Sequence, residues 1–140
     1  MDVNLISEKD LAILKMKLGK NKRNEKDWSM IKDILYTYDL IVPEILDDTA
    51  MTGNINGVMY IDNYLIAFTN PDDCSRQMNS FSQELMMTMR WQMSFKSFVE
   101  LANIADQAGM TLLIDLITDG RTRFINYSKG RVEASFMSRF

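Results

Sequence analysis

Histidine is absent from the sequence, and cysteine occurs once, as Cys74. Histidine is the most common general base and metal ligand in proteins, and a single thiolate cannot build a zinc site. The sequence also lacks a phosphate-binding Walker loop, a dinucleotide-binding glycine pattern and a G-x-S-x-G motif. We therefore expect a protein that is not an enzyme, with no catalytic residue, no cofactor and no bound metal.

Long apolar runs are absent as well. No stretch approaches the roughly 18 residues that a membrane helix needs. The N-terminal residues lack the basic and apolar regions of a secretory signal, and a single cysteine fits a reducing compartment. These observations predict a cytoplasmic protein with no membrane contact. The chain has 140 residues, 46% of them hydrophobic and 25% charged, which is enough for one domain with its own core.

Negative charge is concentrated in the middle third of the chain. Residues 31–75 contain one lysine and eight acidic residues, whereas residues 1–30 and 76–140 each carry a net charge of +2. Such a segment repels a phosphate backbone, and the basic run at residues 20–23 is short, so we expect no nucleic-acid binding. The acids either keep the protein in solution or form a contact face for a basic protein partner. The candidate face consists of Asp47, Asp48, Asp62, Asp72 and Asp73.

Four segments have the pattern of amphipathic helices. Ser7 and Gly19 mark the two ends of the first, and Asn70 followed by Pro71 marks the start of the third. Ser94 is expected to cap the last helix and Gly109 to end it. The expected helices cover residues 5–18, 25–38, 70–78 and 95–108. A basic linker at residues 20–24 divides the chain into an N-terminal segment, 1–24, and a domain, 25–140.

Apolar runs and strict alternation predict the strands. They cover residues 40–45, 58–61, 64–68, 85–93, 110–116 and 123–126. Asp62 and Asn63 are expected to form a hairpin turn, and residues 47–57 a loop. Residues beyond 128 fit either a strand or a short helix. This mixture of helices, strands and hairpins predicts the α+β class: a single domain with a mixed, mostly antiparallel sheet and helices packed on it.

Residues 85–93 alternate between apolar and polar side chains. We expect Met87, Met89 and Trp91 to be buried, because a strand with one buried face has a period of two. The opposite face carries Thr88, Arg90 and Gln92, which we expect to be exposed. The alternative is an adaptable binding surface, since methionine side chains repack easily.

Two further features have both a structural and a functional interpretation. Cys74 lies near the start of a helix, which favours the thiolate, but Asp72 and Asp73 oppose it, so we expect an inert or partly buried thiol. The loop at 47–57 gathers side-chain oxygen atoms that are typical ligands of a hard cation, although the spacing does not match a calcium loop. These belong to Asp47, Asp48, Asn54 and Asn56. The alternative function is therefore a small-molecule or ion-sensing domain.

Residues 28–43 and 64–114 resemble the SseB family, named for enhanced serine sensitivity. The segment Leu40-Ile41-Val42-Pro43 follows a helix, as in the family's Leu-x-Val-Pro strand. The segment Ala67-Phe68-Thr69-Asn70 ends a hairpin, and Leu112-Leu113-Ile114-Asp115 follows a helix that ends in Gly109. The sequence departs from the family after Ile114, where Asp115-Leu116 replaces the usual Asn-Pro. The resemblance implies an α+β fold and a cytoplasmic bacterial protein with the family's N-terminal type of domain, and it carries over no catalytic residue.

The first hypothesis from the sequence is a protein–protein interaction module. A narrower version is an immunity or antitoxin-like protein that binds a basic toxin. Residues 40–45 are apolar and contain Pro43, so they are expected to form an edge strand. The N-terminal helix carries Leu11, Leu14 and Leu18 and is expected to cover that edge. We therefore expect a monomer rather than a dimer formed through the helix or the edge.

Overall fold

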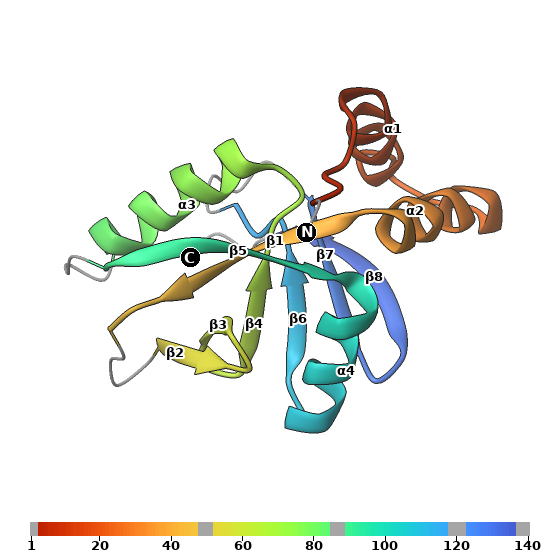
Figure 1. The fold of residues 1–140 in the computed structure, drawn as a ribbon. Helices are drawn as coiled ribbons and strands as arrows, with labels where there is room; N and C mark the ends of the chain where they lie inside the picture. The colour runs from red at the N-terminus through yellow and green to blue at the C-terminus, as the bar shows by residue number, and fades with distance from the viewer. Residues whose placement is uncertain (1–2, 48–51, 85–88, 118–122, 137–140) are drawn as a thin grey trace.

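The computed structural model describes residues 3–47, 52–84, 89–117 and 123–136, which contain four helices and eight strands (Figure 1). The helices are α1 (Glu8–Leu18), α2 (Glu25–Thr37), α3 (Pro71–Glu84) and α4 (Phe98–Ala108). The strands are β1 (Asp39–Ile45), β2 (Thr52–Ile55), β3 (Val58–Ile61), β4 (Tyr64–Ala67), β5 (Trp91–Ser97), β6 (Thr111–Ile114), β7 (Arg123–Ser128) and β8 (Arg131–Phe136).

Six strands form one sheet in the order β2-β3-β4-β6-β7-β8. Within it only β4 and β6 are parallel, and the chain passes from one to the other through α3, β5 and α4. The remaining strands, β1 and β5, form a separate antiparallel pair. The expected α+β class, with a mixed, mostly antiparallel sheet and helices packed on it, is confirmed. The residues beyond 128 form the strand β8 rather than a helix.

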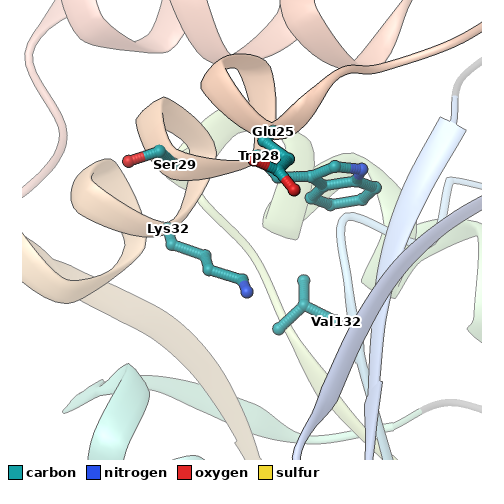
Figure 2. A pocket seen from close by; sticks show the side chains of 5 residues that line it. All are labelled: Glu25, Trp28, Ser29, Lys32 and Val132. Carbon is teal, nitrogen blue, oxygen red and sulfur yellow. The ribbon is translucent and has the colours of Figure 1, made fainter.

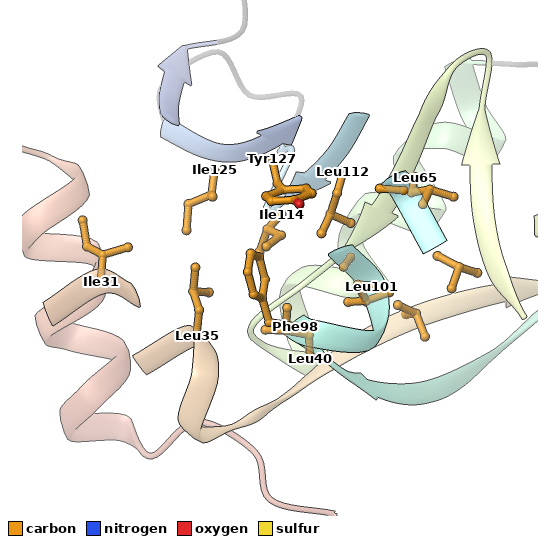
Figure 3. Close-up of a cluster of buried hydrophobic side chains, with 14 of the residues drawn as sticks. Ile31, Leu35, Leu40, Leu65, Phe98, Leu101, Leu112, Ile114, Ile125 and Tyr127 are labelled. Atoms are coloured by element: carbon orange, nitrogen blue, oxygen red, sulfur yellow. The ribbon is translucent and has the colours of Figure 1, made fainter. Parts of the chain in front are cut away.

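Both faces of the six-stranded sheet are covered by packed side chains. Alternate side chains of its central strands point to opposite faces, so these strands contribute to both clusters. On one face, Leu65 of β4 and Leu112 of β6 pack with side chains of α1, α2 and α4, as Figure 3 shows for part of this cluster. On the other face, Ile66 and Leu113 pack with residues of α3. The α3 residues are Cys74, Met78 and Phe81.

Strand β1 connects the two sheets, because its two edges bond to different elements. The even-numbered residues face β5, as the bond from the Leu46 amide to the Arg90 carbonyl at 2.8 Å shows. The odd-numbered residues face away from β5, and there Ile41 exchanges both backbone bonds with Phe68, at 2.8 and 2.7 Å. Leu40, Ile41 and Val42 are fully buried. The expected edge strand is therefore covered by β5 and by the end of β4, and not by the N-terminal helix.

The helix α1 nevertheless packs on the domain, as expected. Leu14 is fully buried and Leu18 is 4% exposed, both within the core beside α2. At the end of α1, Lys17 and Lys20 each place Nζ 2.9 Å from a carboxylate oxygen of Asp27, a residue that is itself 3% exposed. Asp27 also closes a capping box with Asn24 at the start of α2. The basic linker is thus bonded to the second helix.

Several element boundaries differ from the sequence-based expectation. The last helix is capped by Ser97, not Ser94, because Ser97 and Glu100 form a reciprocal capping box. Strand β5 consequently continues through Ser94 to Ser97. Helix α3 begins at Pro71, as expected, where the Asn70 side chain accepts from the amides of the next turn, but it extends to Glu84.

The expected loop at 47–57 contains a strand. β2 pairs with β3 through a two-residue turn formed by Asn56 (φ 51°) and Gly57 (φ 78°). Both residues are left-handed, the conformation of the hairpin turn for which Asn-Gly is the most favoured pair. The expected Asp62-Asn63 turn joins β3 to β4, with Asp62 at φ 51°.

Candidate interaction surface

The structure disperses the acidic residues that were expected to form one contact face. Asp48 lies outside the described residues. Asp62 precedes β4 and Asp72 follows it, so these two exposed carboxylates lie at opposite ends of that strand. Asp73 is only 7% exposed. Its carboxylate is paired with Arg76 and, at 3.4 Å, with Nζ of Lys15 in α1, so it stabilises the fold rather than presenting charge to a partner.

Among the members of the set that the structure describes, Asp47 lies beside β5. The Arg90 guanidinium donates from Nε and Nη2 to the two carboxylate oxygens of Asp47, at 2.7 Å each. This bidentate contact lowers the pKa of Asp47, and the side chain stays about half exposed. Asp47 and Arg90 therefore form a neutral pair on the surface, next to the first residue of β5.

A buried polar cluster lies where the parallel strands β4 and β6 end. Asp115, in the left-handed conformation at φ 63°, accepts from the Thr69 amide at 2.8 Å and from the Thr69 hydroxyl at 2.6 Å. Burial raises the pKa of Asp115. Cys74 is fully buried nearby, and burial together with the Asp115 charge raises its thiol pKa to about 12. The expected inert cysteine is consistent with this environment, and the Asp115–Thr69 contact joins the two strand ends.

The described side-chain oxygens of the 47–57 segment, which belong to residues 47 and 52–57, are not assembled into a cation site. Asn54 uses its whole amide on β1: Oδ1 accepts from the Ile45 amide at 3.0 Å, and Nδ2 donates to the Ile45 carbonyl at 2.6 Å. Asn56 is a turn residue. Among the described residues, no group of three or more histidine, cysteine, aspartate or glutamate side chains could hold a metal ion.

A hollow of about 470 Å³ lies between α2 and β8, and Figure 2 shows the side chains that line it. Trp28, Lys32, Glu25 and Ser29 of α2 line one side and Val132 of β8 the other. The Arg23 guanidinium, which belongs to the linker, lies over the Trp28 ring in a cation–π contact, 5.4 Å from the ring centroid. The hollow is open, and most of its α2 side chains are exposed, so it offers a ligand few enclosing contacts.

The most distinctive surface of the molecule is the outer edge of β5. In an antiparallel pair, alternate residues direct their backbone groups toward the partner strand and away from it. Because even-numbered residues of β5 bond β1, the amides and carbonyls of Trp91, Met93 and Phe95 point outward. Within the described part of the chain these groups have no hydrogen-bond partner. β5 thus presents an unpaired backbone edge.

The side chains of the same three residues form an apolar stripe along this edge. Trp91 and Met93 are partly buried against the α3-side core, and Phe95 is 38% exposed. This corrects the expectation for residues 85–93. Met89 is buried, and Arg90 and Gln92 are exposed, as expected, but Trp91 is only partly buried. Met87 and Thr88 lie outside the described residues.

Natural proteins protect exposed edges with short strands, charges or proline. β5 has seven residues and no proline, and none of its outward-facing residues is charged. The other edge strands differ: β2 has four residues, and β8 carries the charged pair of Arg131 and Glu133. The alternating pattern at residues 85–93 does not reveal this edge, because it places the strand too early and does not show that β1 is its partner.

Comparison with protein-family models, curated proteins and solved structures gives no match for this chain. The resemblance to the SseB family therefore stays a prediction. Among the helices of the described residues, none combines the length and apolar character needed to cross a bilayer.

Proposed function

We propose that this chain is a protein-binding module that takes up an extended segment of a partner protein along β5. The observation that carries the proposal is the row of outward-facing backbone groups at Trp91, Met93 and Phe95. A segment added as a strand bonds these groups in the way that β1 bonds the other edge. Main-chain bonds then supply affinity, and alternate side chains supply specificity.

The side chains beside the edge define the partner segment. On the α3 side, the stripe of Trp91, Met93 and Phe95 favours apolar side chains at every second position of the segment. On the opposite side, β5 presents Gln92, Ser94 and Lys96, which favour polar or acidic neighbours. The segment is therefore amphipathic with a period of two.

This proposal keeps the general hypothesis of an interaction module and changes its partner. An immunity-type protein for a basic toxin needs a concentrated acidic face. The described acids are dispersed: Asp73 is paired within the core, and Asp62 and Asp72 lie at opposite ends of β4. The apolar stripe favours an extended apolar segment over a basic surface.

A displayed library of extended segments, each about nine residues long, tests the proposal, since that length spans a strand the size of β5. The discriminating variant is Met93→Pro, which removes one outward-facing donor. Met93 is opposite Pro43, in a pair that exchanges no backbone bonds, so the substitution leaves the β1–β5 ladder intact. Met93→Leu is the matched control.

We expect alternating apolar segments to be enriched on the wild type and on Met93→Leu, and to be lost on Met93→Pro. Equal enrichment on all three proteins would show that binding does not use the edge. The absence of any enrichment on the wild type would contradict the proposed function.

A further inference from the structure

We infer that, in the absence of a partner, the open edge of β5 pairs with the β5 edge of a second copy of the chain. The inference rests on the same edge as the proposed function and adds a regulatory step to it. Two copies joined in this way form a continuous sheet in the order β1-β5-β5-β1. The dimer conceals the edge that the partner needs, so self-association and partner binding exclude one another.

The register of this dimer follows from the backbone. A two-fold axis at Met93 places the outward-facing groups of Met93 against those of its copy. In the same register Trp91 of each copy lies opposite Phe95 of the other. Directly opposite residues of antiparallel strands lie on the same face. The two apolar stripes therefore merge into one, with an aromatic pair at each end and a methionine pair at the centre.

On the other face of the paired strands, Asp47 has a role in the dimer. In this register Lys96 of one copy lies opposite Arg90 of the other, and two like charges in that position repel. Asp47 neutralises Arg90 through its bidentate contact at 2.7 Å. Asp47 therefore removes a repulsion from the dimer.

The contact is small, so the dimer is reversible. Stable complexes bury roughly 1,200–2,000 Å² in total, and two paired strands of seven residues without supporting elements bury less. A weak dimer protects the apolar edge at high protein concentration and releases it to a partner that binds more tightly.

Cysteine cross-linking of the full chain tests the register. Met93→Cys places two thiols opposite each other across the two-fold axis, at a Cα separation of about 5.5 Å that a disulfide can span. Gln92→Cys is the matched control, because its neighbour across the axis is Ser94 rather than its own copy. The native Cys74 does not interfere, since it is buried with a thiol pKa of about 12. Under mild oxidation we expect rapid cross-linking of Met93→Cys and little cross-linking of Gln92→Cys.

Sedimentation velocity over a range of concentrations tests the energetics. We expect Met93→Pro to weaken dimerisation about tenfold or more, because each copy loses a backbone bond at the axis. Asp47→Asn should also weaken it, and added salt should restore it by screening Arg90 from Lys96. Asp62→Asn, which changes an exposed acid in the β3–β4 turn far along the chain from β5, should have no effect.

The outcomes separate this inference from the proposed function. Equal cross-linking at positions 92 and 93, or a wild type that stays monomeric at high concentration, would overturn the dimer. In either case, segments selected from the library could still bind, and the proposed function would stand. If the dimer forms but no library segment binds or dissociates it, the dimer stands and the proposed function fails.

Discussion

The outer edges of β1 and β5 lie on opposite sides of the same two-stranded pair, and they differ in how many of their outward-facing backbone groups are hydrogen-bonded. On β1 every available outward-facing amide is bonded. Asp39 donates to the Asn4 carbonyl at 2.8 Å, Ile41 to Phe68 at 2.8 Å, and Ile45 to Asn54 at 3.0 Å. The one remaining outward-facing position is Pro43, which has no amide hydrogen to satisfy. On β5 the outward-facing groups of Trp91, Met93 and Phe95 have no partner among the described residues, whereas the Ser97 amide at the end of the strand donates to the Glu100 carboxylate at 3.3 Å.

This difference shows that the fold covers the outer edge of β1 and leaves that of β5 open. The three partners of β1 come from a segment before α1, from the end of β4 and from a side chain of β2. Each covers one residue pair, so β1 is fully bonded although no single strand lies along it. Among the described residues, β5 has a free edge from Trp91 to Phe95, which is the arrangement that accepts a strand from another chain.

Proline substitution at one outward-facing position of each strand gives the largest expected difference in unfolding free energy. Ile41→Pro removes the bond to Phe68 and truncates a fully buried side chain, and it should cost at least about 3 kcal/mol of unfolding free energy. Met93→Pro removes a donor that faces away from β1 and should cost less than about 1 kcal/mol. Urea denaturation of both variants measures the contrast. Similar losses for the two would show that the edge of β5 is bonded in the folded chain.

The side chain of Asn54 provides the next test. At the end of β1 it bonds both backbone groups of Ile45, as a neighbouring strand would. Asn54→Ala leaves both backbone groups of Ile45, a residue 2% exposed, without their partners. We expect a loss of about 2 kcal/mol, the usual cost of buried polar groups that lose their bonds. Asn126→Ala is the control, because the only side-chain bond it removes is one to the Ser135 hydroxyl at 2.7 Å, and it should cost under about 1 kcal/mol. Equal losses would contradict the role assigned to Asn54.

The sequence predicted the helices better than the strands, for a physical reason. Caps and stops are local signals, so Ser7, Asn70 and Gly109 were placed correctly. The error at the start of α4 came from choosing Ser94 over Ser97, although only Ser97 has a glutamate three residues later. The missing strand β2 also had a local signal, the Asn56-Gly57 pair, that was not used.

The candidate site could not be predicted in the same way. Whether a strand has a free edge depends on which strands pair with it, and β1 and β5 are separated in sequence by three strands and the helix α3. The alternation at residues 85–93 correctly identified an amphipathic strand. It could not show that Trp91 would be only partly covered by α3, because that depends on the packing of a helix from elsewhere in the chain.

Truncation of the stripe sharpens the comparison on the side of β5. Because Trp91 is partly buried, Trp91→Ala should cost about 1–2 kcal/mol. Phe98→Ala serves as the reference, since Phe98 is 2% exposed in the main core and should cost about 3–5 kcal/mol. Thermal or urea unfolding gives both values. A loss for Trp91→Ala as large as that for Phe98→Ala would mean that the stripe belongs to the core and is not available to a partner.

The smallest expected effect is a pH dependence at the start of β1, where the Asp39 amide donates to the Asn4 carbonyl of the N-terminal segment. Lys20 and Lys17 hold the pKa of Asp27 well below its usual value in the folded chain. A carboxylate with a lowered folded pKa contributes stability above its unfolded pKa of about 4, and this contribution is lost as pH falls toward the folded pKa. Acid should therefore loosen the contact between α1 and α2. Asn4 lies just before α1, so its bond to the Asp39 amide should loosen with it.

Hydrogen exchange of two β1 amides measures this effect. Between about pH 6 and pH 3, after correction for intrinsic exchange rates, protection of the Asp39 amide should fall while that of the Ile41 amide, bonded to Phe68, stays constant. In Asp27→Asn, which has no carboxylate to titrate, the Asp39 amide should already be less protected at pH 6 and should change less on acidification. A fall of equal size in the wild type and in Asp27→Asn would show that the pH dependence does not come from the Asp27 contacts. The closed edge of β1 would then be independent of how α1 is held.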